Sequence, residues 1–115
     1  MARTKSNHER LLATVETTYR LAERGFDALH SAAATPDEKL RVRELYGAAR
    51  DAYWKAVLAC LEDQSGVVAA IHEELRAKNR ELKRSLETLR DLASALALLS
   101  DAVRLAAALV TLAAA

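Results

Sequence analysis

Apolar residues recur at alternating spacings of three and four over residues 66–113. One row repeats every seven residues and consists of Val68, Leu75, Leu82, Leu89, Leu96, Val103 and Val110. Side chains spaced in this way share one face of an α-helix, and sustained heptads are typical of helices that pack along a partner helix. The stretch has no proline, and its only glycine is Gly66 at its start. The pattern therefore predicts one long helix of roughly 70 Å.

Two earlier segments show the same kind of pattern, each behind a helix start signal. The first helix is predicted over residues 7–33, after a capping serine at Ser6. The second is predicted over residues 36–63, because Thr35-Pro36 supplies an N-cap and a proline in the first turn. The connections between the segments are short, which favours antiparallel neighbours.

These segments predict an all-α fold, a helical bundle of three helices with a very long third helix. From Leu92 a third apolar row appears, and a soluble monomer does not leave such a surface exposed. A second copy of the chain would cover it, so we expect a homodimer or a higher homo-oligomer. The alternative is a break between residues 90 and 101, which would give a four-helix up-down bundle. The residues expected at the oligomer or partner interface are Leu92, Leu96, Leu98, Leu99, Val103, Leu105, Leu109, Val110 and Leu112.

Length and composition favour one domain in the cytoplasm. The 115 residues fit a single helical-bundle domain over 6–115, preceded by a flexible basic tail over 1–5. The net charge of +1 gives no overall field that would attract nucleic acid or an anionic membrane. Cys60 is the only cysteine, which excludes an intramolecular disulfide and favours a reducing compartment. The polar start lacks the apolar run of a signal peptide.

The apolar C-terminal stretch, Leu92–Ala115, is long enough to cross a bilayer. Asp101 and Arg104, however, lie near its centre. On insertion scales the aliphatic side chains of the stretch contribute about −4 kcal/mol, whereas the two charges cost about 5 to 7 kcal/mol. Burial against protein is therefore favoured, and we do not expect a transmembrane protein.

The sequence contains no complete catalytic or metal-binding pattern. His30 follows Asp27 by three residues, but di-metal bundles need two Glu-x-x-His pairs and further carboxylates. His72 begins His-Glu-Glu, which lacks the second histidine of the zinc-protease motif. Cys60 falls on an inner row of the second helix and is predicted to be a buried, inert thiol. We therefore expect no enzyme activity and no cofactor or metal.

The densest basic stretch covers residues 76–84. It precedes heptads and thereby resembles the basic region of leucine-zipper DNA-binding proteins, although Glu81 interrupts it. The resemblance implies contact with nucleic acid. Asn79, on the apolar seam, is expected to fix the register and the number of helices that pair. The residues that would contact nucleic acid are Arg76, Lys78, Arg80, Lys83 and Arg84.

The sequence favours a non-catalytic helical-bundle protein–protein interaction module that self-associates, such as an adaptor, a small chaperone, an immunity-type inhibitor or a regulator. It would bind a protein partner through helix faces. Should residues 92–113 prove to be a fourth helix, a row of Trp54, Leu58 and Leu61 is the next candidate surface. The alternative function is a DNA-binding regulator that uses residues 76–84 ahead of a coiled-coil-like dimerisation segment.

Overall fold

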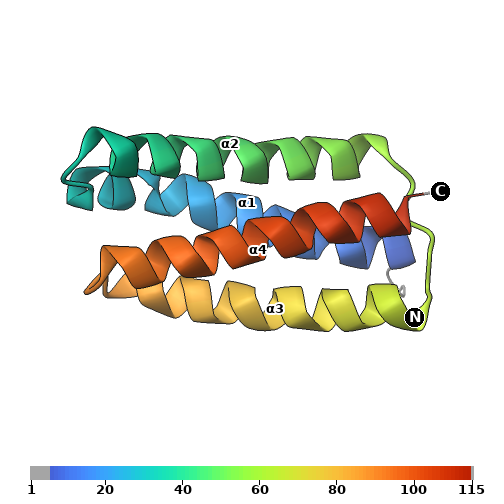
Figure 1. Cartoon of the computed structure of the whole chain (residues 1–115). Coiled ribbons are helices and arrows are strands. Elements are labelled where there is room, and N and C mark those ends of the chain that lie inside the picture. The colour runs from blue at the N-terminus through green and yellow to red at the C-terminus, as the bar shows by residue number, and fades with distance from the viewer. Residues whose placement is uncertain (1–5, 115) are drawn as a thin grey trace.

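Four α-helices make up the structure, a computed structural model that describes residues 6–114 (Figure 1). The helices are α1 (Asn7–Ala32), α2 (Pro36–Leu58), α3 (Gly66–Glu87) and α4 (Leu92–Ala113). The prediction of an all-α fold is confirmed. The tail predicted over residues 1–5 lies outside the described residues.

The single long helix predicted over residues 66–113 is wrong, because the chain leaves the helix after Glu87 and starts a new one at Leu92. Neither glycine nor proline marks this turn. The three-helix description is therefore replaced by four helices packed as a bundle, the alternative expected from a break between residues 90 and 101. The second helix is also shorter than predicted, since it ends at Leu58 rather than at residue 63.

The start of α4 is fixed by Asp91, its N-cap residue. The Asp91 carboxylate accepts a hydrogen bond from the backbone N–H of Ala93 at 3.1 Å and another from the Ser94 hydroxyl at 2.7 Å. These bonds satisfy a free N–H group of the first turn, which would otherwise lack a partner. The Ser94 hydroxyl, followed by the backbone donors, holds the pKa of Asp91 below its ordinary value.

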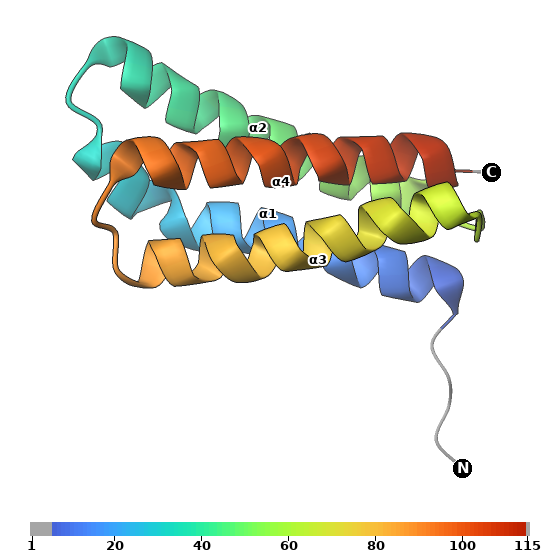
Figure 2. The same ribbon diagram turned by 60° about the horizontal axis from the view of Figure 1, so that its bottom comes forward.

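The helices form two antiparallel hairpins, α1–α2 and α3–α4. α2 also packs on α4, and α1 packs on α3, whereas α2 and α3 make no contact in the part of the chain that the structure describes. Figure 1 shows α2 and α3 on opposite sides, with α1 behind and α4 in front, and Figure 2 shows α4 and α3 side by side. The order around the bundle is therefore α1, α2, α4, α3, and the prediction that the short connection at residues 59–65 joins neighbouring helices is wrong.

Residues 59–65 cross the end of the bundle diagonally from α2 to α3, and they are tied to both neighbouring helices. Leu61 is fully buried and closes the end of the core. Its carbonyl accepts from Asn7 Nδ2 at 3.1 Å, and its N–H donates to His8 Nδ1 at 3.1 Å. The N–H of Glu62 donates to the Ala113 carbonyl at 3.0 Å. The crossing segment therefore joins the start of α1 to the end of α4.

Small side chains let the helices approach closely in the core. At Gly25 of α1, an added Cβ would lie 3.0 Å from both terminal methyl carbons of Leu86 in α3, so the glycine permits this crossing. Alanine plays the same part in α2 and α4. The largest fully buried side chains are Leu29, Leu61, Leu75, Leu82, Leu99, Leu109, Val15, Val42 and Thr18.

The apolar rows of α4 mostly face the other helices of the same chain. By length and composition α4 is the one helix of the described residues that could cross a membrane, and eight of its 22 residues are buried in the bundle. Of the nine residues predicted to form an interface, Leu112 is exposed. Those buried in the chain's own core are Leu99, Val103, Leu109 and Val110. Those half-buried against that core are Leu92, Leu96, Leu98 and Leu105.

We expect Leu99→Ala to lower the free energy of unfolding by about 2 to 5 kcal/mol, because it leaves a cavity in the core. Leu112→Ala removes the same atoms from an exposed position of the same helix and should change stability by no more than about 0.5 kcal/mol. Urea denaturation followed by circular dichroism measures both. Equal effects of the two substitutions would contradict the packing of α4 described here.

Candidate functional site

All five aromatic residues of the chain lie in one cluster shared by α1 and α2. The ring of Tyr19 stacks on that of Tyr53 with centroids 5.2 Å apart, and Phe26 meets Tyr46 edge-on at 5.3 Å. Trp54 contacts Tyr53 at 5.4 Å and is half exposed. A core built from leucine, alanine and valine thus carries its aromatic side chains at one surface.

Arg20 extends this aromatic cluster with a positive charge. Its guanidinium carbon lies 5.1 Å from the ring centre of Tyr19 and 5.9 Å from that of Tyr53. The same guanidinium forms ion pairs with Glu16 at 3.4 Å and Glu23 at 3.2 Å. Tyrosine, tryptophan and arginine are the residue types most enriched in the energetic centres of protein interfaces.

A line of apolar side chains runs along the outer side of α2, away from the core. Leu40 is 45% exposed, Trp54 50% and Leu58 85%. Together with Gly47 these residues are spaced by seven, seven and four, so they share one face of the helix. Val57, 37% exposed, lies beside them. We call Leu40, Gly47, Trp54 and Leu58 the α2 row.

The sequence pattern predicts one exposed row of Trp54, Leu58 and Leu61, and the structure separates them. Trp54 and Leu58 are exposed, whereas Leu61 is buried at the end of the core. The reason is the early end of α2, after which the chain turns across the bundle. Leu40 was not predicted to belong to this surface. It shares the exposed face with Trp54 because it lies two heptads before Trp54 on the same helix.

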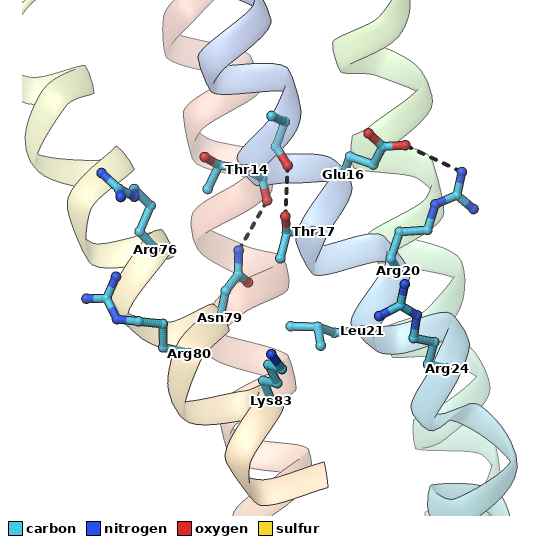
Figure 3. A pocket seen from close by; sticks show the side chains of 11 residues that line it. Thr14, Glu16, Thr17, Arg20, Leu21, Arg24, Arg76, Asn79, Arg80 and Lys83 are labelled. Atoms are coloured by element: carbon cyan, nitrogen blue, oxygen red, sulfur yellow. Dashed lines mark hydrogen bonds and ion pairs between the residues drawn. The ribbon is translucent and has the colours of Figure 1, made fainter. Parts of the chain in front are cut away.

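A second surface is a groove of about 540 Å³ between α1 and α3, and five of its eleven lining residues are basic. Figure 3 shows Arg76, Arg80 and Lys83 along α3, and Arg20 and Arg24 on α1 across from them. We call this the basic groove. Its other lining residues are Ala13, Thr14, Glu16, Thr17, Leu21 and Asn79.

The basic groove gathers only part of the basic stretch predicted from the sequence. Lys78 does not line the groove and pairs with Glu81 at 3.6 Å. Arg84 lies outside it as well, and its Nε donates to the Arg80 carbonyl at 3.5 Å. Arg20 and Arg24 were not predicted to belong to this site, because they come from a helix more than 50 residues earlier in the chain.

A buried polar network joins α1 to α3 beneath the groove. The Thr18 hydroxyl donates to Asn79 Oδ1 at 2.7 Å, and Asn79 Nδ2 donates to the Thr14 carbonyl at 3.1 Å. The Thr14 hydroxyl in turn lies 2.7 Å from His72 Nε2. Asn79 is buried with both ends of its amide bonded, so the network restricts how the two helices can slide. Its predicted role in setting the register stays a prediction.

The residues considered for catalysis or metal binding do not converge in the described part of the chain. There, no group of three or more His, Cys, Asp or Glu side chains could hold a metal ion. His30 stacks on Phe26 at 5.5 Å. The predicted burial of Cys60 is wrong, because α2 ends before it and leaves the thiol exposed. The thiol donates to Glu62 at 2.9 Å, and this carboxylate raises the pKa of Cys60.

No match was found when the chain was compared with protein-family models, with curated proteins and with solved structures. The α2 row, the aromatic cluster and the basic groove are therefore the features of the chain that bear on its function.

The network beneath the groove gives a pH dependence of stability. Burial, followed by the positive charge of Arg76, lowers the pKa of His72. The unfolded chain therefore binds a proton at His72 more readily than the folded chain does. The stabilising contribution is complete above the unfolded pKa of about 6.5 and is lost as pH falls through the lower folded pKa.

We expect His72→Gln to reduce the fall in Tm between about pH 7.5 and about pH 5, because glutamine can still bond Thr14 but does not titrate in this range. Thermal unfolding of both proteins at several pH values measures the difference. His30→Gln is the matched control, since it removes another histidine outside the network. A wild-type pH profile that His72→Gln leaves unchanged would contradict the linkage.

Proposed function

We propose that this chain is a non-catalytic protein–protein interaction module that self-associates through α2. The observation that carries the proposal is the α2 row, with its exposed Leu40, Trp54 and Leu58 next to the aromatic cluster. Trp54, Val57 and Leu58 are neighbouring exposed side chains, and adjacent apolar side chains on a surface mark an interaction site more often than scattered ones do. We further propose that the protein acts in the cytoplasm, as an adaptor or regulator.

The surface proposed here differs from the one inferred from the sequence. Self-association through α4 was expected because its apolar rows exceed what a three-helix body can cover. In the four-helix bundle much of that excess is covered within the chain, since residues such as Leu99 and Leu109 are buried. The largest exposed apolar side chains then lie on α2, which supports placing the contact there.

The partner most compatible with the α2 row is another exposed helix. The apolar residues of the α2 row follow the spacing of one helical face. An amphipathic helix packs against such a row with apolar side chains that have the same spacing. A second copy of the chain always supplies that partner, at the same concentration as the protein itself. Trp54 is expected to contribute most to the contact, since tryptophan is among the residue types most enriched at the energetic centres of interfaces, where leucine is under-represented.

The double variant Trp54→Ser/Leu58→Ser should be monomeric under conditions in which the wild-type protein is a dimer, because it removes the two most exposed apolar side chains of the α2 row. Light scattering after size exclusion, over a range of concentrations, measures the molar mass. Circular dichroism should show unchanged helix content, since both positions are exposed.

Val67→Ser is the matched control, because Val67 is an exposed apolar residue on α3. It should leave the dimer intact. A wild-type protein that is monomeric at every concentration would show that self-association is wrong. A Trp54→Ser/Leu58→Ser variant that keeps the dimer mass would instead exclude α2 as the contact.

A second candidate function, DNA binding, is favoured by one observation. The basic groove brings Arg76, Arg80 and Lys83 of the predicted basic stretch together with Arg20 and Arg24 of α1. Glu16 is the only carboxylate in its lining. Arg20 is already paired with Glu16 and Glu23, and Arg76 pairs with Glu73 at 3.1 Å. Arg24, Arg80 and Lys83 form no ion pair within residues 6–114, and unpaired cations attract phosphate even when the net charge of the chain is close to zero. The candidate differs from the leucine-zipper arrangement, because its basic residues come from two helices of one bundle; Figure 3 shows the guanidinium groups of Arg76 and Arg80 turned away from α1.

For this second candidate, Arg76→Gln/Arg80→Gln should weaken the retention of duplex DNA at low salt. The salt dependence of binding should also fall, by about 0.9 in the slope of log K for each phosphate that the variant no longer neutralises. Fluorescence anisotropy of a labelled duplex measures both. Lys78→Gln/Arg84→Gln removes the same charge from the same helix outside the groove and should have little effect. No binding by the wild-type protein at low salt removes DNA binding from consideration.

A further inference from the structure

We propose that two copies of the chain pair through α2 in parallel orientation and in register, with their closest approach at Gly47. This inference rests on the self-association proposed above and specifies its geometry. Three observations carry it: an unexplained glycine, the positions of the exposed apolar side chains, and the charges on the two flanks of the α2 row.

Gly47 has no role that the described residues explain. It lies in the middle of α2 and is exposed, and a Cβ added there would meet nothing within 4 Å. Glycine in a helix interior is less stable than alanine, so its presence needs a reason. Gly25 has such a reason, namely its contact with Leu86. A second helix that crosses α2 at Gly47 would explain the glycine in the same way, because the missing side chain would permit a close approach.

The apolar side chains of the α2 row favour the parallel orientation. Leu40 lies seven residues before Gly47 and Trp54 seven residues after it. A parallel pair in register sets Leu40, Trp54 and Leu58 each against the same residue of the second copy. An antiparallel pair centred on Gly47 would set Leu58 against Pro36, in the acidic first turn of α2. Leu58, the most exposed large apolar side chain, is covered better in the parallel pair.

The charges beside the row favour the same orientation. At 100° per residue, Arg43 and Arg50 lie on one flank of Gly47, and Glu44 and Asp51 lie on the other. In a parallel two-fold pair, each flank faces the opposite flank of the second helix, so arginine meets carboxylate. In an antiparallel two-fold pair each flank faces its own copy, which would bring like charges together.

Three of these four charged residues are free to pair with a second copy. Arg43, Glu44 and Arg50 are exposed and form no ion pair within residues 6–114. Asp51 already pairs with Lys55 at 2.9 Å and has room for a further donor, because its side chain is 63% exposed.

Cysteine cross-linking distinguishes the two orientations. In a Cys60→Ser background, Leu40→Cys should give a covalent dimer with a short bismaleimide, because the parallel pair sets residue 40 against residue 40. The antiparallel pair would separate these residues by roughly 21 Å and give no cross-link. Leu112→Cys in the same background is the matched control, since Leu112 is exposed to the same degree on α4 and should not cross-link.

A charge exchange gives an independent test. Arg43→Glu/Arg50→Glu makes both facing flanks acidic in the parallel pair and should raise the Kd of the dimer by about tenfold or more. Adding Glu44→Arg/Asp51→Arg exchanges the flanks and should restore dimerisation. In the antiparallel pair each flank faces the same flank of the second copy in both variants. Like charges therefore still meet, and the Kd of the dimer should change little.

These outcomes separate this inference from the proposed function. A dimer that is sensitive to Trp54→Ser/Leu58→Ser but shows no cross-link at residue 40 and no effect of charge exchange overturns the parallel geometry and leaves self-association through α2 in place. A wild-type protein that stays monomeric overturns both. A cross-link at residue 112 in place of residue 40 would assign the contact to α4.

Discussion

The packing of α4 against the other three helices is the interaction on which the rest of the structure depends. Three of the seven residues of the heptad row lie beyond residue 90, in a segment too apolar to stay in water. The turn at residues 88–91 returns it to its own bundle, where Leu99 and Leu109 are buried. Asp91 supports this turn by capping the new helix, but the burial of apolar area supplies most of the free energy.

The order of helices around the bundle decides which surfaces remain open. Because α2 and α3 lie diagonally opposite, residues 59–65 cross the end of the core and Leu61 closes it. α2 is then held by α1 on one side and α4 on the other, which leaves its outer side free. α1 and α3 run in the same direction and frame the basic groove. The α2 row and the basic groove are thus separate surfaces of one small body.

Much of the α2 row could be predicted from the local sequence, whereas the residues that line the basic groove could not. Leu40, Trp54 and Leu58 share a helix, so their common face follows from the helical repeat. Arg76, Arg80 and Lys83 could likewise be grouped from their spacing. Arg20 and Arg24 could not be added to them, because the pairing of α1 with α3 depends on contacts between residues far apart in the chain. The aromatic cluster could not be predicted from the sequence for the same reason, because it combines side chains of α1 and α2.

The sequence by itself determined the helical class and the starts of α1 and α2 at their capping residues, because these follow from interactions within a few residues. It left open whether the last helix continues or turns back. A straight helix covered by a second copy and a broken helix covered by its own chain bury the same apolar rows, so one pattern of residues fits both. Only the tertiary structure decided between them, since the choice depends on whether a cap at Asp91 and the packing of the whole bundle together offset the loss of helix between residues 88 and 91.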